Sequence, residues 1–342
     1  MKILILGGTG LISTAITPLL LEAGHDLTLY NRGRSPAHFP GTPKKIRGDR
    51  QDLATFEKQL GAAGPFDCII DMICFSPAEA HSSVRAFGGR TGQYLFCSTV
   101  DVYTKPAHAY PIPEDHQRQP SPAFPYAFDK ARCEEILQAA HASGAFQLTI
   151  LRPAQTYGEG GKLVHTLGFG TYFLDRIRRG LSLIVHGDGT SLWSACHRDD
   201  VALAFARAVG NTSAYGKAYN VTGEEWLTWD RYYQGLAQAM GAPPPALVHI
   251  PTELLCRALP QAAEWCGINF CFDNIFDNRA ARQDLGFRYT IPWVEGAHRT
   301  IGWLEQQGQI DKSETQPFYD RLLAAWERLG LGLVEDMREG AP

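Results

Sequence analysis

The stretch "KILILGGTGLIS", from Lys2 to Ser13, joins an apolar run to a glycine-rich turn. The run is typical of a buried strand, and residues 11–25 have the period of a helix. Gly7 and Gly10 have the spacing of a dinucleotide-binding turn, where glycines let the backbone approach a pyrophosphate at a helix N-terminus. The third glycine position of that pattern holds Ser13. We expect nucleotide contacts from Gly7, Thr9, Gly10, Leu11 and Ile12.

Further apolar runs alternate with helix-like segments along the first half of the chain. Strands are predicted at residues 26–33, 66–75 and 93–103. The last two are apolar enough to lie inside a parallel sheet that is covered on both faces. This alternation predicts an α/β fold, a Rossmann-type doubly wound parallel sheet, followed by a smaller C-terminal substrate lobe.

The same pattern sets the expected domain boundaries. Residues 1–157 are assigned to the dinucleotide-binding domain, and residues of about 195–222 return to it as a helix and a strand. Residues 158–342 are assigned mainly to the substrate-binding lobe. The segment 105–125, rich in proline and turn formers, is expected to be a long loop facing the substrate.

Composition excludes several classes of partner. The 342 residues carry a net charge of −4 with no block of Lys or Arg, so no nucleic-acid partner is predicted. No apolar stretch approaches the roughly 20 residues that span a bilayer, and no secretory signal is expected at the N-terminus, so no membrane partner is predicted. The eight cysteines lack metal-site spacing. We expect no metal, and reduced thiols in a cytoplasmic protein.

The end of the second predicted strand bears on the choice of cofactor. Asn31, Arg32 and Arg34 stand where a carboxylate usually binds the adenosine ribose of NAD. Two guanidiniums can accept a 2′-phosphate instead, which favours NADP within an NAD(P) assignment. Alternatively, the arginines are solvated loop residues. Asp49 is a candidate for an adenine contact or for a surface turn.

The segment "YAFDK" places Tyr126 and Lys130 four residues apart on one face of a predicted helix. An ammonium group beside a phenol lowers the tyrosine pKa towards neutrality and produces a general acid/base for a carbinol proton. Ser98 and Thr99 end the strand that precedes this helix. The Tyr-x-x-x-Lys spacing alone is equally typical of a solvated helix face.

With these motifs, the chain from Met1 to about Leu304 resembles the extended short-chain dehydrogenase/reductases, the NAD-dependent epimerase/dehydratase family. "LRPAQTYGEG", "GDGTSLWSACHRDDVALAF" and "FDNRAARQDLGFRYTIPWVEGAHRTIGWL" resemble later landmarks of that family in the correct order. The resemblance implies a Rossmann domain with a small substrate lobe, and a homodimer as the usual assembly.

The resemblance also implies a Thr–Tyr–Lys triad. Thr99 is expected to hydrogen-bond the reacting oxygen, Tyr126 to exchange its proton, and Lys130 to hold the cofactor ribose. Ser98, Tyr126 and Lys130 are expected to contact the cofactor. Asp101 occupies the position of the carboxylate that removes a proton beside a transient ketone in sugar dehydratases. A polar residue that shapes the loop is the alternative for Asp101.

Two departures from the family pattern concern the substrate. Trp193 stands where many members have an Arg that grips a sugar nucleotide's diphosphate, and Gln155 replaces the usual Asn. A diphosphate needs cationic partners, whereas an indole offers an apolar face for a sugar ring. A free or glycosidic sugar, or another polyol, is therefore favoured over a nucleotide sugar. His197 matches a His of the family's closing segment and is a candidate for substrate contact or for a structural role.

Three functions remain open. The leading one is a sugar epimerase or dehydratase that oxidises a hydroxyl transiently through the Thr–Tyr–Lys triad. The alternative is an NADPH-dependent carbonyl or sugar reductase, or a dehydrogenase, that exchanges its cofactor. The third is a non-catalytic nucleotide- or RNA-binding protein on the same fold, because fold alone does not determine function.

Overall fold

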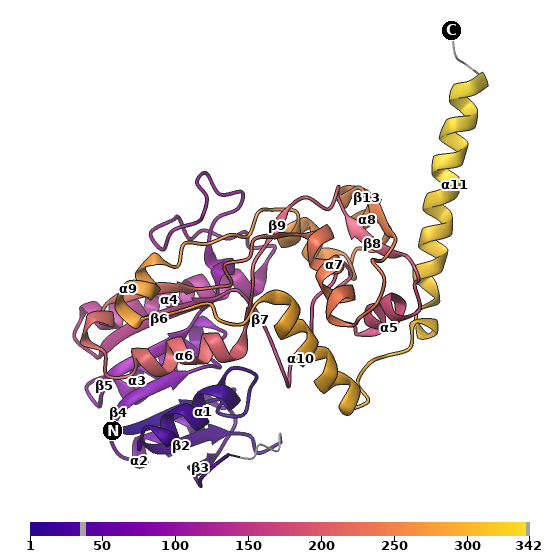
Figure 1. Ribbon diagram of the computed structural model, residues 1–342. Helices are drawn as coiled ribbons and strands as arrows, with labels where there is room; N and C mark the ends of the chain where they lie inside the picture. The colour runs from indigo at the N-terminus through magenta and orange to yellow at the C-terminus, as the bar shows by residue number, and fades with distance from the viewer. Residues whose placement is uncertain (35–38, 340–342) are drawn as a thin grey trace. The chain divides into compact units, whose positions relative to one another are not determined.

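The computed structural model describes residues 1–34 and 39–339 and divides the chain into two compact units (Figure 1). The first unit comprises Met1–Gly158, Ser194–Trp226 and Asn274–Trp293, and the second comprises Glu159–Trp193, Leu227–Asp273 and Val294–Pro342. Residues 195–222 thus belong to the first unit. Asn274–Trp293 also belongs to it, although its irregular sequence did not suggest this.

The first unit is built on one seven-stranded parallel sheet. Its strand order is β11-β6-β5-β4-β1-β2-β3. The strands are β1 Lys2–Leu6, β2 Asp26–Asn31, β3 Lys44–Arg47, β4 Phe66–Asp71, β5 Thr91–Cys97, β6 Gln147–Pro153 and β11 Lys217–Val221. Because the chain runs outward from β1 to β3 and then crosses to β4, the strand order reverses beside β1. Ligands of doubly wound sheets bind at this switch point, outside the carboxyl ends of the strands.

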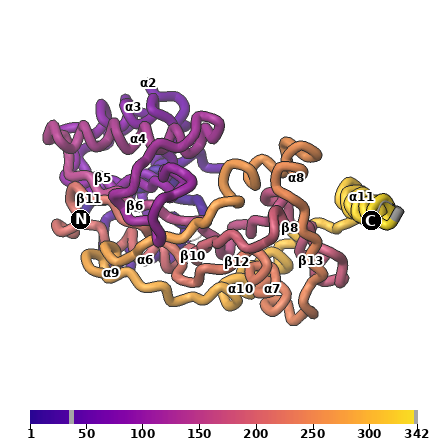
Figure 2. Tube along the Cα trace, turned by 90° about the horizontal axis from the view of Figure 1, so that it is seen from above, coloured from indigo at the N-terminus to yellow at the C-terminus, as the bar shows by residue number. Residues whose placement is uncertain are grey.

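Helices cover both faces of this sheet (Figure 2). One face carries α1 Ser13–Glu22, α6 Arg198–Ala208 and α9 Arg279–Leu285, and the other carries α2 Leu53–Ala62, α3 Pro77–Phe87 and α4 Pro125–Ala142. Strand β1 shows why: Ile3 and Ile5 pack into the α1/α6 core, whereas Leu4 and Leu6 pack into the α2/α3/α4 core. Alternate residues of a strand point to opposite faces, so an all-apolar strand needs both layers. The predicted doubly wound α/β sheet is confirmed.

Short elements complete the first unit: η1 Val100–Val102, β7 Gln155–Tyr157, β10 Ala195–His197 and η2 Thr212–Ala214. Two predicted strands were too long at their C-termini. β4 ends at Asp71, whose Oδ1 accepts a hydrogen bond from the Ile73 N–H at 3.0 Å. β5 ends at Cys97, and Thr99 then caps the 3₁₀ turn η1 by accepting from the Asp101 N–H at 3.2 Å. Both side chains turn the backbone out of the sheet.

The predicted loop before α4 is confirmed, since no helix or named strand occurs between η1 and Pro125 in the described structure. Pro18 lies inside α1. None of the described helices is long and apolar enough to cross a membrane.

The second unit is mainly helical, with short paired strands. Its elements are α5 Tyr172–Arg178, β8 Leu183–His186, β9 Leu192–Trp193, β12 Leu227–Thr228, α7 Trp229–Ala239, β13 Leu247–Ile250, α8 Thr252–Ala258, η3 Cys266–Phe270, α10 Trp293–Gln306, η4 Ser313–Thr315 and α11 Pro317–Glu339. Its core is aromatic: the Trp193 ring lies 5.2 Å from Trp229 and 5.1 Å from Phe270, measured between ring centroids.

Candidate active site

The glycine-rich turn joins β1 to α1 at the switch point of the sheet. Gly7 has a φ of +82°, which residues with a side chain rarely adopt, and a Cβ there would lie 2.4 Å from the Ile73 side chain. A Cβ on Gly8 would lie 2.8 Å from Leu29. Within the described structure, no side chain caps the start of α1, so the positive end of its dipole stays available to an anion. These features fit the pyrophosphate of a dinucleotide.

Ser13 replaces the third glycine of the pattern without disturbing the turn. Its hydroxyl donates to the Gly7 carbonyl at 2.6 Å and accepts from the Gly10 N–H at 2.9 Å. The side chain is buried and therefore links both ends of the turn to the first residue of α1.

A pocket of about 280 Å³ adjoins this turn. It is lined by Gly7, Thr9, Gly10, Asn31, Arg32, Gly33, Arg34, Gly48, Asp49, Arg50, Gln51, Ile73, Phe75 and Glu79. These residues come from the loops that follow β1, β2, β3 and β4, and from the start of α3. Seven of the sequence-predicted cofactor residues thus line one pocket: Gly7, Thr9, Gly10, Asn31, Arg32, Arg34 and Asp49. Leu11 and Ile12 lie beside it, in the residues that precede α1.

The polar groups at the pocket's rim are arranged by local hydrogen bonds. Asn31 accepts from the Gly33 N–H at 2.9 Å, and Asp49 accepts from the Gln51 N–H at 3.1 Å. Arg32 and Arg34 are exposed. The end of β2 carries no carboxylate, and two exposed cations stand where dinucleotide-binding sites contact the adenosine ribose.

The candidate catalytic groups lie at the carboxyl end of β5 and at the start of α4. The Thr99 hydroxyl lies within hydrogen-bonding reach of the Tyr126 phenol. Lys130, one turn further along α4, is 1% exposed, and its Nζ donates to the Cys97 carbonyl at 2.7 Å. The ammonium also lies 4.6 Å from the Phe75 ring centroid, and Phe75 lines the cofactor pocket. The structure therefore brings Thr99, Tyr126 and Lys130 together beside that pocket.

The pKa of Tyr126 differs from the sequence-based expectation. Burial of the hydroxyl end raises it, the Asp101 carboxylate raises it further, and the hydrogen bond with Thr99 lowers it. The residue as a whole is 38% exposed, so water reaches the ring and weakens the effect of burial. The ammonium of Lys130 is directed to a backbone carbonyl instead of the phenol. Tyr126 is consequently protonated at neutral pH, which suits a proton donor.

Asp101 follows Thr99 in the turn η1. One carboxylate oxygen accepts from the Thr99 hydroxyl at 3.2 Å, and the other lies 3.5 Å from the Lys105 ammonium. The carboxylate is thus held by two neighbours on its own loop. It lies next to the hydroxyl that would bind a reacting oxygen.

Ser98 faces away from its expected cofactor contact in this structure and joins a buried ionic cluster. Its hydroxyl donates to Glu134 at 2.6 Å. Glu134, on α4 one turn after Lys130, also accepts two hydrogen bonds from Arg152, at 2.8 and 2.7 Å, and one from Arg118 at 2.6 Å. Burial raises the Glu134 pKa, but Arg152, Ser98 and Arg118 together lower it below its usual value. The cluster fixes the catalytic helix against β5 and β6.

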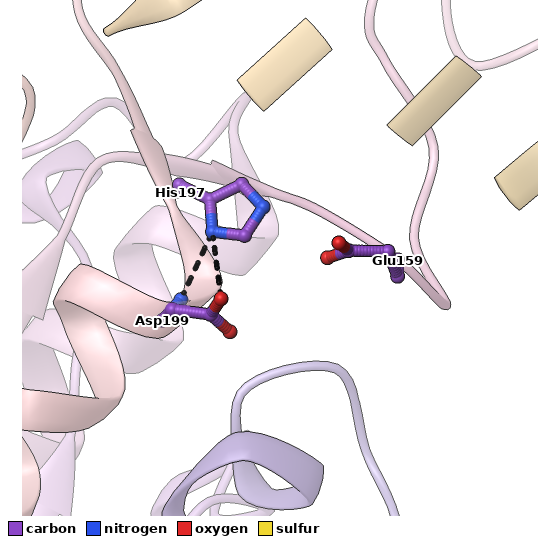
Figure 3. A group of neighbouring side chains, drawn as sticks. All are labelled: Glu159, His197 and Asp199. Carbon is purple, nitrogen blue, oxygen red and sulfur yellow. Dashed lines mark hydrogen bonds and ion pairs between the residues drawn. The ribbon is translucent and has the colours of Figure 1, made fainter. Parts of the chain in front are cut away.

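The three predicted substrate residues occupy different surroundings. Gln155 is in β7, and its Oε1 is buried without a hydrogen-bond partner among the described residues. Trp193 lies in the second unit and is 5% exposed within the aromatic core. His197 is fully buried in the first unit, where its Nδ1 accepts from the Asp199 N–H at 3.3 Å and so caps α6 (Figure 3). This contact supports the structural alternative for His197.

Sequence reasoning missed several residues of the pocket wall. Arg50, Ile73, Phe75 and Glu79 line it, and none stands in the glycine motif. A signal was available for Arg50, because "RGDRQD" places it directly after Asp49. No local pattern marks Phe75, whose role depends on the packing of Lys130.

The parallel sheet and the glycine turn at its switch point define a Rossmann-type dinucleotide-binding fold. Residues 3–222 match the model of the NAD dependent epimerase/dehydratase family. The chain belongs to this family, and it is an NAD(P)-dependent enzyme.

The curated relatives of this chain differ in function: one is named a reductase and another a stem-loop binding protein. The chain is 27% identical to the 2′-dehydrokanamycin reductase of Streptomyces kanamyceticus over 277 residues, which cover 81% of this chain and 77% of that one. It is 29% identical to the chloroplast stem-loop binding protein of 41 kDa b of Arabidopsis thaliana over 261 residues, covering 72% of this chain and 65% of the plant protein.

Among solved structures, the UDP-glucose 4-epimerase of Bifidobacterium longum in complex with NAD⁺ and UDP is similar, with a TM-score of 0.70. The identity is 18%, and the match covers 91% of this chain and 100% of that one. At this identity the likeness supports the fold.

Proposed function

We propose that the protein is an NADPH-dependent reductase of a carbonyl group on a sugar-like or polyol substrate. The observation that supports this most directly is the cofactor pocket, in which arginines stand where NAD-binding sites usually have a carboxylate. NADPH is the usual exchangeable reductant, so a site suited to it favours net reduction over internal redox. The reductase among the similar proteins agrees with this direction.

The residues of this chain would act as follows. When bound in the pocket, NADPH would supply the hydride for the carbonyl carbon. Tyr126, protonated at neutral pH, donates its proton to the carbonyl oxygen, while the Thr99 hydroxyl hydrogen-bonds the same oxygen. Lys130 uses one of its three N–H donors on the Cys97 carbonyl and keeps the others for the cofactor ribose.

The first test identifies the nucleotide. Freshly purified protein is denatured and the released nucleotide is analysed by mass spectrometry, and NADPH oxidation is then followed with carbonyl sugars. We expect protein without bound nucleotide, and turnover that consumes NADPH. Tyr126→Phe should lower kcat by about 10²- to 10⁴-fold, because it removes the proton donor. Unchanged activity in that variant would overturn the catalytic assignment.

A second candidate is an epimerase or dehydratase that oxidises its substrate transiently. The position of the Asp101 carboxylate, 3.2 Å from the Thr99 hydroxyl, favours it, since a base there can remove a proton beside a transient ketone. This function predicts tightly bound oxidised cofactor and no net redox change. Asp101→Asn should then abolish turnover, whereas a simple reductase should retain most of it.

A third candidate function is RNA binding, because one similar plant protein is named a chloroplast stem-loop binding protein. The net charge of −4 opposes it. A filter-binding titration with structured RNA at 150 mM salt decides: saturable binding in the micromolar range or tighter would favour this candidate over both enzymes.

A further inference from the structure

Arg50 is a buried arginine in the wall of the cofactor pocket. It follows Asp49 in the loop between β3 and α2, and it is 4% exposed. The guanidinium carbon lies 3.8 Å from the centroid of the Phe56 ring, which holds the side chain flat against α2. Arginine at such a depth normally has a partner for each N–H group.

Only part of the guanidinium is satisfied. Nη2 donates to the Glu79 carbonyl at 2.5 Å and to the Ser83 hydroxyl at 2.8 Å. Nε and Nη1 have no hydrogen-bond partner among the described residues. A buried donor left unsatisfied is destabilising, and an acceptor on a ligand bound in the pocket would remove this cost.

The nearest carboxylate does not supply that acceptor. Asp71 lies 3.9 Å from Nη2, beyond hydrogen-bonding distance. Its oxygens already accept from the Tyr94 hydroxyl at 2.5 Å and from the Ile73 N–H at 3.0 Å. Burial disfavours the charge on Arg50, but Asp71 and its neighbours outweigh this and raise the Arg50 pKa, so the guanidinium stays charged.

We infer that Arg50 is a specificity-determining residue that binds the 2′-phosphate of NADP in the pocket that the exposed Arg32 and Arg34 also line. A phosphate offers several acceptor oxygens and negative charge, and guanidinium groups bind it in planar geometry. This inference rests on the proposed function. A contact from Arg50 to the adenine ring instead would strengthen NADP and NAD binding equally.

Two mononucleotides that differ only in the 2′-phosphate test the inference. Isothermal titration gives the Kd of 2′,5′-ADP and of 5′-AMP for the wild type, for Arg50→Leu and for Arg50→Lys. We expect the wild type to prefer 2′,5′-ADP by at least about tenfold, and Arg50→Leu to reduce this preference by about 10- to 100-fold. Arg50→Lys should fall between the two, since it keeps the charge but loses the planar fork.

Arg90→Leu is the matched control. Arg90 is also anchored to backbone carbonyls, those of Gly61 at 2.6 Å and Ala86 at 3.3 Å, but it does not line the pocket. This variant should keep the wild-type preference. The preference is a ratio measured on one sample, so a partly folded variant still reports it.

The outcomes separate the inference from the function on which it rests. Equal weakening of both nucleotides in Arg50→Leu, or a wild type without preference, overturns the role of Arg50 while leaving an NAD(P)-dependent reductase intact. Arg50→Lys keeps the buried charge and therefore remains the informative variant if Arg50→Leu does not fold. A wild type that binds neither NADPH nor NADH overturns the proposed function and this inference together.

Discussion

Two buried arginines of the first unit differ in how their charge is balanced. Arg152, at the base of the catalytic helix, is 1% exposed and uses all three nitrogens inside the chain. Nε and Nη2 bind the two oxygens of Glu134, and Nη1 donates to the Tyr103 hydroxyl and the Glu114 carbonyl, both at 2.8 Å. Arg50, in the cofactor pocket, has two nitrogens without a hydrogen-bond partner in residues 1–34 and 39–339.

We interpret the charge of Arg152 as structural and the charge of Arg50 as available to a ligand. Burial alone does not make the distinction, because both side chains are almost completely covered. The hydrogen-bond partners of the individual N–H groups do distinguish them, since each buried N–H group needs an acceptor in the chain or in a ligand. Substitution of the two arginines should therefore have different effects on stability and on nucleotide binding.

The largest effect is expected for Arg152→Met. It leaves the Glu134 carboxylate buried with much weaker compensation, which should lower the free energy of unfolding by about 3–5 kcal/mol. Urea titration of the full chain measures it. Arg85→Met is the control, because Arg85 forms an exposed ion pair with Glu57 and should contribute less than about 1 kcal/mol. Equal losses in the two variants would contradict the assigned role of Arg152.

A double variant tests whether Glu134 and Arg152 act as one unit. Glu134→Gln combined with Arg152→Met should be less destabilised than the sum of the single variants, by about 1–3 kcal/mol, because both fully buried charges are removed and only the partly exposed Arg118 loses its carboxylate partner. The same urea titrations complete the cycle. Strict additivity would mean that the two residues are energetically independent.

A smaller effect is expected for Arg50→Met in the absence of nucleotide. It removes hydrogen bonds to Glu79 and Ser83 and the positive charge 3.9 Å from the buried Asp71 carboxylate, but it also removes two unsatisfied donors. Asp71 keeps its hydrogen bonds from Tyr94 and Ile73, so stability should fall by about 1–2 kcal/mol, less than in Arg152→Met. The stabilisation of the wild type by saturating NADPH should shrink in this variant, which a thermal shift assay records. If Arg50→Met lowered the free energy of unfolding as much as Arg152→Met does, the role of Arg50 would be structural.

The smallest effect concerns pH. The partners of Glu134 lower its folded pKa below the ordinary 4.5, so its contribution to stability is fully present above that value and is lost as the pH falls through the folded pKa. The stability difference between the wild type and Glu134→Gln should therefore change by less than about 0.5 kcal/mol from pH 8 to 5, and shrink below that range. A change near neutral pH would indicate a raised pKa instead.

Much of the fold could be predicted because it depends on local patterns. Short stretches such as "KILILGG" predict the strands that alternate with helices and the glycine turn. Thr99, Tyr126 and Lys130 could be selected because spacing and family resemblance agree, and the structure brings them together.

The rest depends on contacts between residues far apart in the chain. Glu134 meets Ser98, Arg118 and Arg152 only after α4 docks on the sheet, so no window of sequence reveals the cluster. The direction of the Tyr126 pKa was also beyond the sequence, since it depends on where the Lys130 ammonium points. Arg50 was visible as a charged residue, but its burial against Phe56 was not.

The discontinuity of the first unit has a consequence for synthesis. Its sheet lacks β11 until Val221 has been made, and its last segment ends at Trp293, 135 residues after Gly158 (293 − 158). At roughly 5–20 residues per second, a ribosome needs about 7 to 27 seconds to cover that interval. Until Val221 has been made, β6 is an open edge strand on a nascent chain that already carries its complete glycine turn. A bound nucleotide can therefore begin to stabilise the unit before its sheet is complete.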